Sequence, residues 1–315
     1  MATTTNDTSW RPIEPTMFGA EPCLVEATRV AAGQVDGRLR LIDDHDFFFE
    51  HEIDHLPGLY LLEAAHQLAR LTTRGEARWA SEAEIRFLRY AEKGAPLELQ
   101  GRELSDGRWQ LRALQGGVAV VEGACRWTSE LIPLPALRAP ALLRGGRAIP
   151  SEPVRREWVH KRRQENVLLE WLGRDLQQER FLAGLAPALD HPFFRPRQAR
   201  CWPELLVIEA LRQLAEAISH RHYGVPLGDA FVLEEIQIEQ ARPAGLDAPL
   251  LLVAEPLEVK RRKGVLREAS CRFLAYHGEE EVLRAEGRWR VVPARVYRRL
   301  RGEALAASAG QRGAA

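Results

Sequence analysis

Hydrophobic and polar positions along the chain form two kinds of pattern. Short alternating or continuously apolar runs predict β-strands, and two longer apolar runs of helical spacing each begin at a proline. The first helix is expected from Pro57 to about Arg70, and the second from Pro203 to about Ser219. The strand-like runs are 23–32, 38–42, 83–91, 97–104, 109–115 and 118–128, then 165–172, 180–185, 231–239, 249–259, 265–276 and 282–292. One apolar helix among many strands, twice over, predicts an α+β fold in which each helix packs on one face of an antiparallel sheet.

The two halves of the chain are related by an internal repeat. When the sequence is shifted by 146 positions, eleven of the twenty-six residues in 44–69 are identical to those in 190–215. Average residue usage would give roughly two such identities. The expected division is a first copy, a linker rich in Pro, Gly and Arg, a second copy and a disordered tail, at 16–132, 133–153, 154–300 and 301–315.

Each predicted helix carries a line of polar residues at i, i+3, i+4 and i+7, which places them on one face. The lines are Glu63, His66, Gln67 and Arg70, and then Glu209, Arg212, Gln213 and Glu216. A carboxylate in an apolar helix needs a partner or must be neutral, and burial raises its pKa towards the range of acid–base catalysts. Each line is therefore either a self-satisfied ion pair or a site. The recurrence of the glutamate and the glutamine favours a site.

Residues 51–58, HEIDHLPG, contain a match to the zinc-protease pattern H-E-x-x-H. Both histidines of that pattern must lie on one helical turn to share a metal. Pro57 favours a helix that starts there rather than one that spans 51–55. The aligned segment of the second copy, RQARCWPE, has no histidine. We therefore predict no metal site.

Composition excludes several other classes of function. The chain has 44 basic and 44 acidic residues, so its net charge implies no binding to nucleic acid. Its four cysteines form no C-x-x-C, which indicates a reducing cytoplasm. No apolar run approaches the ~20 residues of a membrane span, and no export signal is expected. No glycine-rich phosphate loop is present, so we predict no nucleotide or other cofactor.

Residues 47–67, FFFEHEIDHLPGLYLLEAAHQ, resemble the central helix region of hotdog-fold 3-hydroxyacyl-carrier-protein dehydratases, with their FF-x-x-H and P-G-x-x-x-x-E-A-x-x-Q motifs. A closer resemblance is to the AfsA-like family, named for A-factor biosynthesis. Its DH-x-PG-x-x-LLEAARQ motif is matched at 54–67, its V-H-K…V-x-L-x-x-W motif at 159–171, and its H-x-x-Y-G-V-P-x-G-x-x-F motif at 220–231.

This resemblance covers roughly residues 20–295 and implies a tandem (double) hotdog, in which each copy is an antiparallel sheet wrapped around a central helix. In the family the V-H-K copy stands first, whereas here it stands second, which marks a divergent member. The family's arginine in EAARQ is His66 here, whereas the second copy keeps Arg212. Two equivalent acid–arginine sites are therefore not expected.

Hotdog dimers build their sites from a histidine of one unit and a helix acid of the other. The resemblance thus implies a main site in which His51 of the first copy faces residues of the second. The expected catalytic residues are His51, Glu209, Arg212 and Glu63. The expected substrate-binding residues are Gln213, Gln67, His66, Asp54, His55 and Arg197, of which Arg197 would face Glu63 in a reciprocal site. Asp54 and His55 either line one of the pockets or cap the first helix.

The family resemblance implies an acyltransferase. It would transfer a β-ketoacyl group from an acyl-carrier-protein or CoA thioester to a hydroxyl of a small phosphorylated acceptor such as dihydroxyacetone phosphate, in the synthesis of a γ-butyrolactone or butenolide signal. His51 or Glu209 would take the hydroxyl proton, and Arg212 would hold the phosphate or the oxyanion. The basic clusters at 161–163 and 260–263 are either docking points for an acidic carrier protein or solvated faces.

Two other functions are compatible with the same residues. One is a hotdog dehydratase or thioesterase that acts on 3-hydroxyacyl or acyl thioesters with His51 and Glu209. The other is a non-catalytic acyl-binding module, favoured by the replacement of arginine by His66. A double hotdog is expected as a monomeric pseudo-dimer or a homo-oligomer.

Overall fold

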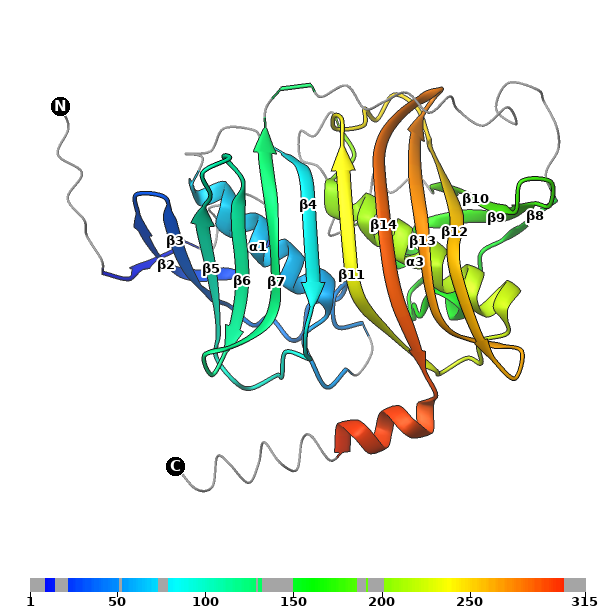
Figure 1. The fold of residues 1–315 in the computed structure, drawn as a ribbon, viewed down its shortest axis with the longest axis horizontal. Coiled ribbons are helices and arrows are strands. Elements are labelled where there is room, and N and C mark those ends of the chain that lie inside the picture. The colour runs from blue at the N-terminus through cyan, green and yellow to red at the C-terminus, as the bar shows by residue number, and fades with distance from the viewer. Residues whose placement is uncertain are drawn as a thin grey trace.

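A computed structural model of the protein describes residues 9–14, 22–50, 53–72, 79–128, 130–131, 150–185, 191 and 201–302. A curved antiparallel sheet of 14 strands runs the length of the molecule, and two helices lie against one of its faces (Figure 1). Helix α1 (Gly58–Thr72) lies behind the strands of the first half, and helix α3 (Glu204–Tyr223) behind those of the second. Neither helix, nor any other in the described part of the chain, has the length and apolar character needed to cross a bilayer.

The two halves share one strand topology. The strands of the first half are β1 (Arg11–Pro12), β2 (Val25–Ala31), β3 (Gln34–Leu39), β4 (Trp79–Phe87), β5 (Leu97–Glu103), β6 (Trp109–Gln115) and β7 (Val118–Thr128). Those of the second are β8 (Ser151–Pro153), β9 (Leu169–Asp175), β10 (Arg180–Leu185), β11 (Ala230–Gln240), β12 (Leu250–Arg262), β13 (Val265–His277) and β14 (Glu280–Val292). From the outer edges inward, the orders are β1-β2-β3-β5-β6-β7-β4 and β8-β9-β10-β12-β13-β14-β11. The predicted α+β fold with two copies of one unit is confirmed.

Strands β4 and β11 join the halves by antiparallel pairing at the centre of the sheet. Ile85 lies directly opposite Ile236 in this pair, and both side chains are buried. Because these strands would otherwise be exposed edges, their pairing removes two rows of unsatisfied backbone groups. The hydrophobic core is accordingly one cluster that draws on both helices and both halves of the sheet.

The predicted helix starts are correct to one residue. The N–H groups of Tyr60 and Leu61 donate to the carbonyl oxygen of Pro57, and α3 begins in the same way after Pro203. The end predicted for α3 is four residues short, because the apolar stripe weakens before the helix stops. The stop signal is Gly224, which adopts the left-handed conformation (φ 66°) that ends helices and that glycine takes without steric cost.

Several strand boundaries also differ from the predictions, and β4 starts and ends four residues before its predicted 83–91. Strand β3 ends at Leu39 rather than 42, because the chain turns away there and the N–H of Ile42 donates to Tyr60 Oη of α1. Strand β9 begins at Leu169, because 164–166 form a short 3-10 helix, η2 (Gln164–Asn166).

After β14 the chain is helical over residues 294–302 and crosses the lower edge of the sheet towards the first half (Figure 1). Arg301 is buried there, with its guanidinium 2.8 Å from Asp54 Oδ2 and 2.6 Å from Glu92 Oε2. The start of the segment expected as a tail is thus a helix docked on the other copy. Residues 303–315 lie outside the described part, as does most of the predicted linker, and the domain boundaries stay a prediction.

The repeat supplies a matched pair of glycines for a test of packing. Gly123 of β7 lies opposite Ile85, and Gly287 of β14 lies opposite Ile236. A Cβ at Gly123 would come within 2.1 Å of the carbonyl oxygen of Glu84, whereas one at Gly287 meets only Phe273, at 3.5 Å. We expect Gly123→Ala to lower the free energy of unfolding by about 1–3 kcal/mol, and Gly287→Ala to change it by less than about 0.5 kcal/mol. Urea unfolding of both variants checks this, and equal effects would contradict the asymmetry.

Candidate active site

A buried polar cluster lies where α3 meets the segment before β9. Glu209, in the middle of α3, is fully buried. Its two carboxylate oxygens accept hydrogen bonds from Arg212, at 2.6 Å from Nε and 2.7 Å from Nη2. Lys161 Nζ lies 3.0 Å from Glu209 Oε1. The predicted pair Glu209–Arg212 therefore exists, and a second cation completes it.

The cations set the ionisation of Glu209. Burial alone would raise the pKa of this carboxyl, but the charges of Arg212 and Lys161 outweigh burial and lower the pKa to about 2. Glu209 is thus a permanent carboxylate with both oxygens occupied. A group of this kind orients cations well but is a weak proton acceptor.

The first half of the molecule reaches into the same cluster through the segment before α1. Glu50 Oε1 accepts hydrogen bonds from the backbone N–H groups of Arg162, at 2.7 Å, and of Arg163. Glu50 Oε2 lies 3.9 Å from Lys161 Nζ, and the ring of Phe47 packs under the same ammonium at 4.4 Å. The cluster therefore contains residues of both copies, the arrangement expected of a main site. His51, the next residue, and Arg197 lie outside the described residues.

The two repeated glutamines have the same structural role in both helices. Gln213 Oε1 accepts from the N–H of Leu168, and its Nε2 donates to the carbonyl oxygen of Asn166 and to Glu209 Oε1. Gln67 makes the equivalent bonds to Leu24, Pro22 and Glu63. Both side chains are fully buried. Each glutamine therefore holds its glutamate and ties its helix to the chain before the sheet.

Beyond Arg212 the cluster continues to two histidines. Arg212 Nη1 donates to Glu216 Oε1, which lies 4.0 Å from His160 Nδ1. His160 Nε2 is 2.9 Å from His220 Nε2, and His220 Nδ1 is 2.9 Å from the carbonyl oxygen of Val225. Burial raises the pKa of Glu216 to about 7. The charge of Arg212 lowers this pKa only in part, because the negative charge of Glu209 opposes it.

The equivalent place on α1 is chemically different. The imidazole of His66 packs on Trp127, with ring centroids 4.7 Å apart, and burial with the charge of Arg70 lowers its pKa to about 3. Glu204, in the first turn of α3, reaches the same region. Its Oε2 atom is buried without a hydrogen-bond partner among the described residues, and burial raises its pKa to about 7. This second region therefore favours neutral side chains.

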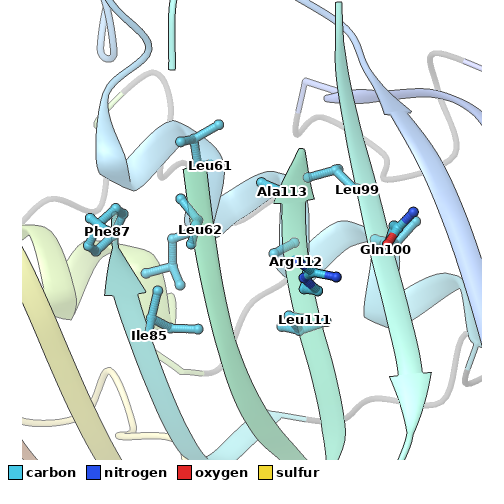
Figure 2. Close-up of a pocket in the computed structure, with 12 residues that line it drawn as sticks. Leu61, Leu62, Ile85, Phe87, Leu99, Gln100, Leu111, Arg112 and Ala113 are labelled. Carbon is cyan, nitrogen blue, oxygen red and sulfur yellow. The ribbon is translucent and has the colours of Figure 1, made fainter. Parts of the chain in front are cut away.

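Two adjoining cavities follow the apolar side of α1. The first, about 20 Å³, is shown in Figure 2, where Leu61 and Leu62 of α1 lie near Ile85, Leu99 and Leu111 of the sheet. The second has a similar volume of about 20 Å³ and extends to Glu63, His66 and Glu204. The two share four lining residues, which are Leu62, Ala65, Ile85 and Leu111. A largely apolar path therefore runs along α1 to the region of His66.

Asp54 and His55 belong to a third cluster. Asp54 Oδ1 lies 2.8 Å from His55 Nδ1 and 3.1 Å from Tyr297 Oη, and Asp54 Oδ2 accepts from Arg301. Among the described contacts they join the C-terminal helix to the first copy, rather than line a pocket with Glu209 or Glu63. His55 forms an isolated bridge with Glu92 before α1 starts, so the second histidine of HEIDH is not on a helix. No group of three potential metal ligands occurs among the described residues, which do not include His51.

Three residues of the main cluster were not predicted from the sequence, which are Glu50, His160 and His220. Glu216 was predicted only as a member of the polar line on the second helix, and Lys161 only as part of the basic cluster 161–163. His160 and Lys161 are the last two residues of the V-H-K motif, which was therefore the available signal. Of the two alternatives for 161–163, a docking point or a solvated face, the solvated face is wrong for Lys161, whose side chain is 7% exposed because it lies against Glu209. Nothing in the sequence pattern pointed to Glu50.

Each half of the molecule is an antiparallel sheet that holds a central helix, and the two halves are joined edge to edge. This arrangement, with polar clusters at the junction of the copies, defines a double-hotdog protein. Solved structures support this class. A trans-AT polyketide synthase dehydratase domain from Brevibacillus brevis superposes with a TM-score of 0.55 at 11% identity, over 85% of this chain and 97% of that one. A thioesterase II from Thermobifida fusca gives 0.51 at 16% identity, over 85% and 96%. At such identities these likenesses establish the fold alone.

The model of the A-factor biosynthesis hotdog domain (AfsA) matches residues 19–129 and 147–293, so the chain belongs to the AfsA family, as the sequence motifs predicted. A curated relative from Streptomyces griseus, a 2-oxo-3-(phosphooxy)propyl 3-oxoalkanoate synthase, is 32% identical over 158 residues, which are 48% of this chain and 51% of the relative. A synthase of the same name from Streptomyces virginiae is 28% identical over 162 residues, 50% of this chain and 54% of that one. The chain thus spans about half the length of the curated relatives it matches.

Glu204 gives a pH-dependent test of this geometry. Its pKa in the folded protein is raised from 4.5 to about 7, so its contribution to stability is complete below pH ~4.5 and is lost as the pH rises through 7. Glu204→Gln cannot ionise. We expect it to be more stable than the wild type at pH 8.5 by on the order of 1–3 kcal/mol, with the difference much smaller at pH 5. Urea unfolding of both proteins at the two pH values checks this. The same difference in stability at both pH values would contradict a buried carboxyl group with a raised pKa.

Proposed function

We propose that the protein is an acyltransferase that moves a β-ketoacyl group from a thioester to the hydroxyl of a three-carbon phosphate. The name of the Streptomyces relatives describes such a product, a 3-oxoalkanoate ester of a phosphorylated hydroxypropanone. The acceptor with that structure is dihydroxyacetone phosphate, and the ester would lead to a γ-butyrolactone or butenolide signal. The observation that carries the proposal is the buried cluster of Arg212, Lys161 and Glu209 in the second copy, which Glu50 of the first copy contacts.

Arg212 is suited to hold the acceptor's phosphate. Among the described contacts, three of its five N–H groups are used by Glu209 and Glu216. Its side chain is 33% exposed, whereas that of Glu209 is 1% exposed. The guanidinium is therefore the solvent-accessible charge of the pair, and its planar shape can bind phosphate oxygens with defined geometry.

Glu209 and Lys161 support this anion site rather than carry out proton transfer. Glu209 fixes the plane of the Arg212 guanidinium through two hydrogen bonds, and Lys161 balances its charge. Because the pKa of Glu209 is about 2, Glu209 is poorly suited to take the hydroxyl proton, and the base must be another residue. Glu63, which bonds Gln67 and lines the cavity on the other helix, stays a candidate for the reciprocal site.

The path along α1 is a candidate for the acyl chain. Its walls are mostly apolar side chains of the helix and the sheet, which favour burial of an alkyl chain, with Gln100 and Arg112 as the polar lining residues of the first cavity. Its present volume of about 20 Å³ is close to that of one water molecule, so an acyl chain enters only if these side chains shift.

The partners and location of the protein follow from this proposal. The donor would be an acyl-carrier-protein or CoA thioester, and exposed Arg162 and Arg163 lie beside the cluster to meet an acidic donor. A cytoplasmic location fits the four free cysteines. The two copies would act within one chain, as a monomeric pseudo-dimer or a larger assembly.

The test is to mix purified protein with a β-ketoacyl carrier protein and dihydroxyacetone phosphate, and to follow the products by mass spectrometry. We expect ester that forms only with the phosphorylated acceptor. In Arg212→Gln, loss of two charged hydrogen-bond donors should raise the KM for the acceptor roughly 10- to 100-fold. Arg221→Gln is the matched control, because Arg221 lies on the same helix but pairs with exposed Glu152.

Other products would identify other functions. Enoyl product or free acid without acceptor would indicate a dehydratase or a thioesterase. Acyl binding without turnover would indicate a non-catalytic module. An equal rise in KM for Arg221→Gln would show that Arg212 is not the acceptor site.

A further inference from the structure

His160 is held in an unusual backbone conformation at the edge of the active-site cluster. It follows the 3-10 helix η1 (Arg156–Val159) with φ 54° and ψ 37°, the left-handed region that residues other than glycine seldom adopt. Val159 on one side is fully buried, and the N–H of Lys161 on the other donates to the carbonyl oxygen of Arg156 at 2.9 Å. The buried neighbours thus fix a strained turn that directs the imidazole towards α3.

The hydrogen bonds of the two histidines define which nitrogen of each carries a proton. A carbonyl oxygen only accepts, so His220 Nδ1 must donate to Val225, and Nε2 of a neutral His220 must then accept. His160 Nε2 lies 2.9 Å from that nitrogen and is therefore the donor. A neutral His160 consequently has an unprotonated Nδ1. This chain of bonds is the kind that selects a catalytic tautomer.

The unprotonated nitrogen lies beside Glu216 and near Arg212. His160 Nδ1 is 4.0 Å from Glu216 Oε1, and Arg212 donates to that same oxygen. The side chain of His160 is 25% exposed and that of Arg212 is 33% exposed, whereas Glu216 is 5% exposed. His160 and Arg212 thus both lie next to the carboxyl group of Glu216, and both side chains are partly exposed. A phosphate on Arg212 would bring a hydroxyl of the same small molecule close to His160.

We propose that His160 is the general base for the acceptor hydroxyl, an inference that rests on the proposed acyl transfer. Nδ1 takes the hydroxyl proton as the acceptor oxygen bonds to the thioester carbonyl carbon. When the carbon–sulfur bond breaks, the imidazolium returns the proton to the thiolate. The ester and the free thiol are the products, and no further reactant is needed. His220 is a positioning residue that keeps the proton on Nε2.

The charges around His160 tune this role. Arg212 and Glu216 face it from α3, Lys161 is its neighbour in the chain, and Asp229 acts on its partner His220. Burial, and then the charges of Arg212 and Lys161, lower the pKa of His160 to about 4, so the imidazole is neutral at physiological pH. A phosphate bound to Arg212 would offset the positive charge and raise that pKa, which makes His160 a stronger base when the acceptor is present.

The experiment compares His160→Gln, Arg212→Gln and His51→Gln with the wild type in the ester-forming assay, over a range of pH. We expect His160→Gln to lower kcat by about 10²- to 10⁴-fold with little change in the KM for the acceptor. Arg212→Gln removes a positive charge that lowers the pKa of His160, so the acid limb of its kcat profile should move to higher pH. His222→Gln is the control, because His222 packs on Phe181 away from the cluster.

A kcat of His160→Gln within threefold of the wild type would overturn the role of His160 alone, as would an unmoved acid limb in Arg212→Gln. If His160→Gln does not fold, the Arg212→Gln profile decides. A large loss of kcat confined to His51→Gln would assign the base to His51 instead. Absence of ester from the wild type would overturn the proposed function and the role of His160 with it.

Discussion

The pairing of β4 with β11 is the contact on which the rest of the molecule depends. It joins two seven-strand sheets at their inner edges into one sheet of 14 strands. Both helices then pack on the same face, and the segment before α1 reaches the region of α3 and Lys161. Without this pairing each half would expose an edge strand, and Glu50 would have no route to the second copy's cluster. The cross-copy site is thus a consequence of backbone pairing in the centre of the sheet.

The two halves share one topology, but the charges around their central helices differ. In the second copy Arg212 and Lys161 surround the helix glutamate and keep it ionised. In the first copy the position of Arg212 is taken by His66, which packs on Trp127 and is kept neutral by burial and by Arg70. One region therefore suits anions, and the other suits apolar chains and uncharged groups. A single chain with two copies can separate these tasks, which two identical subunits cannot do.

The sequence predicted the fold well because the fold is encoded in local patterns. Most strand runs, both proline helix starts and the 146-residue repeat are visible in hydrophobic spacing, and the structure agrees with them. Of the candidate site, only the pair of Glu209 and Arg212 on the polar face of the second helix was predictable from the sequence. Glu50 and Lys161 are distant from α3 in the chain, and each carries a charge that a sequence pattern reads as exposed. Only tertiary packing shows that Lys161 is buried against Glu209, and that helix α3 continues to Gly224.

Repetition between the copies is a poor guide to chemistry in this molecule. Gln67 and Gln213 recur because each ties its helix to the chain before the sheet, a requirement of the fold. The residues of the proposed proton-transfer path are those that do not recur. On the same shift of 146 positions, His160 falls on Glu14, Arg212 on His66 and Glu216 on Arg70. A duplicated unit must keep the contacts that hold its helix in its sheet, but it is free to change the groups around a site. Divergence between the copies therefore indicates where one of them carries a function that the other does not.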